Sequence, residues 1–128
     1  MSSPEVEAGV RRTLALYCHT VDDGHFDEFE SCWDADAVVR VQGQELTGRA
    51  AIRAWIEAAM PLERRGRHLT FNTLVDGEGD AATAVSDFAF VKVRGDDAPR
   101  ITVTGRYLDT LRQEDGAWVL TARSIELD

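Results

Sequence analysis

The segment Arg67–Val75, RHLTFNTLV, lies where the helical spacing of apolar residues gives way to the alternation typical of strands. Three further strand-like segments follow it, at Ala81–Val93, Arg100–Gln113 and Ala117–Leu127. The turns between them are rich in glycine and aspartate. Helices followed by a strand meander predict an α+β domain, with the helices packed on one face of the sheet.

Upstream of this segment, the sequence predicts three helices. Ser3-Pro4 supplies a capping hydroxyl and a proline for the start of the first helix, which ends at Asp22-Asp23-Gly24. A single apolar stripe runs along it: Val6, Val10, Leu14, Tyr17 and Val21. We expect a second short helix around Asp27–Trp33, a short strand at Ala37–Val41, and a third helix that begins at Thr47-Gly48-Arg49 and ends at Pro61.

The two faces of the strand at Arg67–Val75 differ in character. One parity carries Leu69, Phe71, Thr73 and Val75, and the other carries His68, Thr70, Asn72 and Leu74. If the second face is in solvent, its polar groups need no explanation. If it faces the helices, it lines a cavity with an imidazole and a carboxamide. Strand parity alone does not decide between these alternatives.

Asp22 stands at the end of the first helix, beside its apolar stripe. A partly buried carboxylate at that position suits general acid–base chemistry, whereas the neighbouring Asp23 is explained as a solvated turn residue. Asp22 and His68 are far apart in the sequence, so only the fold can bring them together. Capping by Asp22 and a structural role for His68 remain the alternatives to catalysis.

Short motifs in a fixed order make the chain similar to a known family. From the N-terminus they are Tyr17, Asp22, Gly24 and Phe26-Asp27; Trp33 and Asp36-Ala37; Gly48-Arg49 and Ile52; Arg67-His68 and Asn72; Gly79-Asp80 and Ala82; Gly105-Arg106-Tyr107 and Asp109; and Asp115-Gly116, Trp118 and Arg123. Together they resemble the SnoaL-like, scytalone dehydratase-like branch of the nuclear transport factor 2-like superfamily.

The resemblance implies one domain over residues 1–128. Its fold is a cone-shaped roll, in which three N-terminal helices pack against a strongly curved mixed or antiparallel sheet and enclose a pocket. It also implies a homo-oligomer, a dimer or trimer formed through the sheet. In such relatives an Asp–His pair acts on a carbonyl-activated C–H or a hydroxyl, and Asp22 and His68 stand at those positions.

The expected function is that of a cofactor-independent lyase or isomerase acting on a hydrophobic, oxygenated substrate of polyketide, steroid or aromatic type. His68, oriented by Asp22, would remove a proton next to a carbonyl, and Tyr17 or Asn72 would stabilise the enolate oxygen. Further pocket candidates are Trp33, Trp55, Asp87 and Tyr107. The alternative is a non-catalytic binding or assembly module with the same pocket.

Composition excludes several other classes of function. The 128 residues carry a net charge of −9, which argues against nucleic acid and anionic membranes as partners. The N-terminus shows no signal peptide and the two cysteines show no metal spacing, so we expect a cytoplasmic protein with reduced thiols. His19 and His25 have no metal-ligand spacing with His68, and no phosphate-binding loop is present. We therefore expect neither a metal nor a cofactor.

Overall fold

The computed structural model describes residues 2–128 and confirms the α+β class. In chain order, its elements are α1 (Pro4–Asp23), α2 (Phe26–Glu30), β1 (Trp33–Val41), β2 (Gln44–Thr47), α3 (Arg49–Ala59), the 3₁₀ turn η1 (Leu62–Arg64), β3 (Arg67–Glu78), β4 (Ala81–Lys92), β5 (Arg100–Glu114) and β6 (Ala117–Leu127). Within this range, no helix is both long and apolar enough to cross a membrane.

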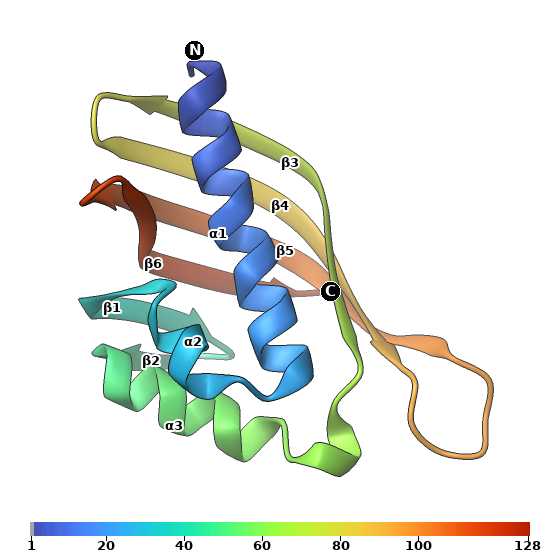
Figure 1. Ribbon diagram of the computed structural model, residues 1–128. Coiled ribbons are helices and arrows are strands. Elements are labelled where there is room, and N and C mark those ends of the chain that lie inside the picture. The colour runs from blue at the N-terminus through green and yellow to red at the C-terminus, as the bar shows by residue number, and fades with distance from the viewer. Residues whose placement is uncertain (1) are drawn as a thin grey trace.

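Six strands form one mixed sheet in the order β2-β1-β6-β5-β4-β3. β1 and β6 are parallel and the other neighbours are antiparallel. The sheet is open, because β2 and β3 are its two edges and do not pair with each other. Figure 1 shows the helices on one side of this twisted sheet, with α1 running across it and α3 beside β1 and β2.

The second helix is shorter than the sequence predicted. It ends at Glu30, and Trp33 begins β1 instead of closing the helix. The reason is pairing with the last strand: Leu120 N–H donates to Cys32 O at 2.7 Å, and Trp33 lies opposite Leu120. Tertiary pairing therefore overrides the helical spacing of Phe29 and Trp33.

Both ends of α1 follow the predicted local chemistry. The Ser3 hydroxyl accepts from Val6 N–H at 3.2 Å, and Gly24 adopts a left-handed C-cap with φ 71°. Near its start, α1 packs so closely on β6 that a Cβ on Gly9 would lie 2.4 Å from the Trp118 ring. These contacts fix the axis of α1, and the Gly24 cap fixes where Asp22 stands.

Aromatic rings fill the space between α1 and the central strands. Tyr17 contacts the rings of Phe29, Trp33 and Tyr107, with centroid separations of 5.5, 6.1 and 6.0 Å. The guanidinium of Arg123 lies between Tyr17 and Tyr107, at 4.3 and 3.7 Å from their ring centroids. This arrangement leaves the candidate site at the margin of the core, toward β3.

Candidate active site

Asp22 and His68 meet where the end of α1 faces the start of β3. The Asp22 Oδ1 lies 2.7 Å from His68 Nδ1, and its Oδ2 accepts the backbone N–H of His68 at 2.9 Å. Each side chain is 7% exposed. An ionised carboxylate can only accept, so Nδ1 carries the proton, and Nε2 of a neutral ring keeps its lone pair.

Neighbouring rings hold the imidazole of His68 in place. Phe90 lies 4.8 Å from it, centroid to centroid, and Tyr17 presents an edge at 6.2 Å. With Nδ1 fixed by Asp22, the ring has little freedom to turn. Nε2 is therefore the atom of this pair that is left to act as a base.

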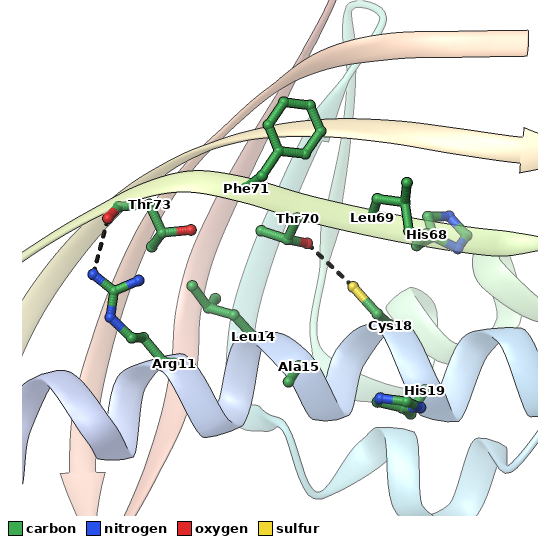
Figure 2. Close-up of a pocket in the computed structure, with 10 residues that line it drawn as sticks. All are labelled: Arg11, Leu14, Ala15, Cys18, His19, His68, Leu69, Thr70, Phe71 and Thr73. Carbon is green, nitrogen blue, oxygen red and sulfur yellow. Dashed lines mark hydrogen bonds between the residues drawn. The ribbon is translucent and has the colours of Figure 1, made fainter. Parts of the chain in front are cut away.

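A groove of about 450 Å³ runs between α1 and β3 and reaches His68. Figure 2 shows its walls, with Leu14, Ala15 and Cys18 on the helix opposite Thr70 and Thr73 on the strand. The remaining lining residues are Arg11, His19, His68, Leu69 and Phe71. The volume falls within the range of roughly 300–1,000 Å³ that small-molecule sites occupy.

The thiol of Cys18 and the hydroxyl of Thr70 join the two walls of the groove. Cys18 Sγ and Thr70 Oγ1 are hydrogen-bonded at 3.2 Å (Figure 2). Burial raises the pKa of Cys18, and the bond to Thr70 opposes this shift in part. Near neutral pH the groove therefore contains a protonated thiol and a hydroxyl, both neutral hydrogen-bond donors.

A β-bulge at Asn72 changes which face of β3 points to α1. Asn72 has φ 54°, and the pairing register with β4 shifts between Phe71 and Leu74. Before the bulge, His68 and Thr70 face the helix, and after it Thr73 and Val75 do, whereas Leu69, Phe71 and Leu74 are exposed. The helix-facing residues thus come from one alternating set before the bulge and from the other set after it, so neither set faces the helix along the whole strand.

The bulge places Asn72 away from the pocket where the sequence had positioned it. Asn72 Nδ2 donates to Asp87 Oδ2 at 3.0 Å, and Arg106 Nε donates to Asp87 Oδ1 at 2.9 Å. These two donors lower the pKa of Asp87. Asn72 and Asp87 form a polar cluster with Arg106 at the surface, and neither lines the groove. The sequence expectation that they line the substrate pocket does not hold for the groove beside His68.

The predicted aromatic pocket residues are core residues. Tyr17, Trp33 and Tyr107 are buried, Trp55 is partly buried against the core, and none of the four lines the groove. Burial raises the pKa of Tyr17 to about 12, against the opposing charge of Arg123. Tyr17 contacts the site only through the His68 ring. Because its pKa is raised, the phenol of Tyr17 stays neutral beside that ring.

Arg11, Cys18 and Thr70 line the groove but were missed as site residues. A usable signal was present, since Arg11, Ala15, Cys18 and Asp22 recur at helical spacing and share one face of α1. That stripe lies beside the apolar one, and tracing it back from Asp22 would have found Arg11. Among residues 2–128, no group of three or more His, Cys, Asp or Glu is arranged to hold a metal ion.

Comparisons with known proteins show which family and which solved structures the chain resembles. A model of the SnoaL-like domain family matches residues 3–124. Aln2 from a Streptomyces species superposes with a TM-score of 0.91 at 26% identity, covering 100% of this chain and 94% of that one.

Two further solved structures are similar. A protein of unknown function from Mycobacterium tuberculosis gives a TM-score of 0.87 at 28% identity over 94% of this chain and 70% of its own. An NTF2-like protein with a cystatin-like fold from Novosphingobium aromaticivorans gives 0.85 at 24% identity over 96% and 82%. No curated protein matches the chain by sequence.

Proposed function

The chain belongs to the SnoaL-like domain family and has the nuclear transport factor 2-like fold, and on that basis we propose that it is a cofactor-independent acid–base enzyme. Its substrate is a hydrophobic, oxygenated small molecule of polyketide, steroid or aromatic type. The proposal is carried by the Asp22 carboxylate, which holds His68 Nδ1 at 2.7 Å beside a groove large enough for such a molecule.

The first step is removal of a proton from the carbon next to a substrate carbonyl. His68 Nε2 takes the proton, and the carboxylate of Asp22 stabilises the imidazolium that forms. The thiol of Cys18 and the hydroxyl of Thr70 are neutral groups in the groove lining; one donates its proton to the other, and the acceptor keeps a proton that it can donate to the enolate oxygen. Both are aligned across the groove by their bond to each other.

The fate of the enolate decides the type of reaction. Return of the proton to another carbon gives an isomerase. Protonation of a leaving hydroxyl gives a dehydratase, and attack of the enolate on a second carbonyl gives a cyclase. All three begin with the same proton abstraction, so one assay of that step tests the proposal without the natural substrate.

The test is exchange of the acidic C–H protons of bicyclic ketones such as 2-tetralone with D₂O, followed by NMR. We expect exchange above the solvent rate with the wild-type protein. Asp22→Asn and His68→Gln should each lower the enzyme-dependent rate at least ~100-fold, the lower end of general acid–base contributions.

The matched control is His19→Gln, because His19 lines the same groove and forms no ion pair with a carboxylate within residues 2–128. It should keep the wild-type exchange rate. Circular dichroism and thermal melting establish that each variant is folded. If the wild-type protein exchanged the protons of these ketones no faster than His68→Gln does, the proposal would be overturned and a non-catalytic binding module favoured.

A further inference from the structure

The groove beside His68 has a lining that suits an anion. Its charged or chargeable residues are Arg11, His19 and His68, and none of the described lining residues is an aspartate or glutamate. The chain as a whole has 23 acidic and 14 basic residues, for a net charge of −9. The two carboxylates next to the lining, those of Asp22 and Glu7, are paired with His68 and Arg11, so a negatively charged ligand meets no unpaired acid at these two ends.

Arg11 stands at the end of the groove opposite His68. Figure 2 shows its side chain reaching from α1 to β3, where Nη2 donates to Thr73 O at 3.0 Å. The same nitrogen lies 3.4 Å from Glu7 Oε1, and the two side chains are 49% and 41% exposed. Within residues 2–128, no hydrogen bond uses Nη1 or Nε of Arg11. The guanidinium is thus anchored by one nitrogen and has free donors for a carboxylate.

Between these two ends, the helix side of the groove has the apolar side chains of Leu14 and Ala15, whereas the strand side carries the hydroxyls of Thr70 and Thr73 (Figure 2). Leu69 and Phe71 stand at the rim, and their side chains point away from α1. Thr73 is five positions after His68 in β3, which corresponds to at most about 17 Å at roughly 3.3 Å per residue. The guanidinium of Arg11 is anchored at Thr73 O, so a ligand that contacts both Arg11 and His68 must be elongated.

We infer that the ligand of this groove is an elongated aromatic or polyketide-like carboxylate, with its acid group on Arg11 and its reacting carbonyl or hydroxyl group at His68. The inference rests on the proposed function for the reacting end only. Arg11 binds and orients the ligand and takes no part in proton transfer. Specificity for acids over their neutral esters comes from this one side chain.

The test is binding of 6-hydroxy-2-naphthoate and of its methyl ester, both followed by their own fluorescence. The acid should bind the wild-type protein more tightly than the ester. Arg11→Gln should raise the dissociation constant of the acid about three- to tenfold, as expected for loss of a partly exposed charged hydrogen bond, and leave that of the ester within twofold. Arg11→Lys should keep most of the affinity for the acid.

Two charge-matched controls separate a local contact from the overall field. Arg12→Gln makes the same change in charge at the next position of α1, which is exposed and does not line the groove, and should change neither constant. Glu7→Gln should tighten binding of the acid, because Glu7 competes for Arg11 Nη2, whereas Glu5→Gln should not. The inference would be overturned if Arg11→Gln and Arg12→Gln raised the dissociation constant of the acid equally. It would also be overturned if Arg11→Gln weakened binding of the acid and of the ester by the same factor.

The outcomes distinguish this inference from the proposed function. Ketone exchange that depends on His68, with naphthoate binding that ignores Arg11, overturns the carboxylate assignment and leaves the acid–base enzyme standing. Naphthoate binding that depends on Arg11, without exchange, supports the anion site and overturns catalysis.

Discussion

At the scale of single residues, Asp22 divides its two oxygens between the side chain and the main chain of His68. One oxygen orients the imidazole, and the other takes the backbone N–H that faces outward from the edge strand β3. The end of α1 and the start of β3 therefore position each other. In the proposed mechanism, a base held in this way needs no rearrangement before it acts.

Cys18 gives a prediction on pH dependence. Burial places its pKa above the usual value, and the thiolate is the form that reacts with iodoacetamide, so alkylation at pH 7.5 should be at least ~10-fold slower than that of an unhindered thiol. The rate should keep rising with pH through 9, because the thiolate fraction is still increasing there. Peptide mass spectrometry measures modification at each cysteine.

Cys32 is the internal control for this experiment. It is also buried, its pKa is raised to about 11, and it does not line the groove. Cys32 should react more slowly than Cys18 at every pH, and 6-hydroxy-2-naphthoate should slow Cys18 alone. A rate at Cys18 that levels off below pH 8 would contradict a raised pKa.

At the scale of elements, β3 shows why periodicity predicts a strand better than it predicts a face. The alternation along Arg67–Val75 was sufficient to predict a strand, and the pairing with β4 confirms it. Nothing in a two-residue period marks the bulge at Asn72, where a positive φ and the bond to Asp87 move the strand by one residue. The strand was therefore predictable from sequence, and the location of Asn72 was not.

The pairing of β1 with β6 lay beyond sequence prediction for a different reason. Val38 lies beside Ala122 in a parallel pair, and the whole of β3–β5 intervenes between them. Local patterns carry no information on which distant strand completes a sheet. The meander of β3–β6 was predictable because its neighbours in sequence are neighbours in the sheet.

The central strands β5 and β6 share a buried ion pair whose removal should be costly. Arg123 Nε and Nη2 donate to Asp109 at 2.7 and 2.9 Å, and the side chains are 1% and 0% exposed. Asp109→Asn should lower the free energy of unfolding by about 3–5 kcal/mol, since it leaves a buried cation uncompensated. Urea denaturation followed by tryptophan fluorescence measures the change.

An exposed pair on the same sheet supplies the control. Asp87→Asn removes the carboxylate beside Arg106 at the surface and should change the unfolding midpoint far less. The double substitution Asp109→Leu with Arg123→Met should recover much of the loss, because no charge remains buried. A small effect of Asp109→Asn would show that water or another group reaches Arg123.

At the scale of the whole molecule, the face of the sheet opposite the helices exposes large apolar side chains. Leu74 is 74% exposed, Ile101 60% and Leu108 38%, on strands β3 and β5. Leu74 and Leu108 lie on either side of Val85 in the sheet, and exposed apolar side chains gathered in this way are typical of an interface between proteins. The expected partner is a second copy of the chain, as the family resemblance implies.

Leu108→Glu tests this assembly in sedimentation velocity. Leu108 lies on β5, inside the sheet, so a charge there should oppose pairing through this face and leave a monomer, whereas we expect the wild type to sediment as the dimer or trimer that the family resemblance implies. Leu62→Glu is the matched control, because Leu62 is the same residue type and is also exposed but lies in η1, outside the sheet. A wild-type monomer at all concentrations, or equal effects of both substitutions, would contradict dimerisation through the sheet.

The two hydrogen bonds between Asp22 and His68 also bear on the order in which these residues would be lost in evolution. A replacement of His68 by any residue except proline keeps a backbone N–H for the carboxylate, so the strand edge stays satisfied after the imidazole has gone. Loss of Asp22 first would leave both that N–H and the ring without their partner. In descendants that abandon the proposed chemistry, the histidine should therefore be lost before the aspartate, which would remain bonded to the backbone of β3.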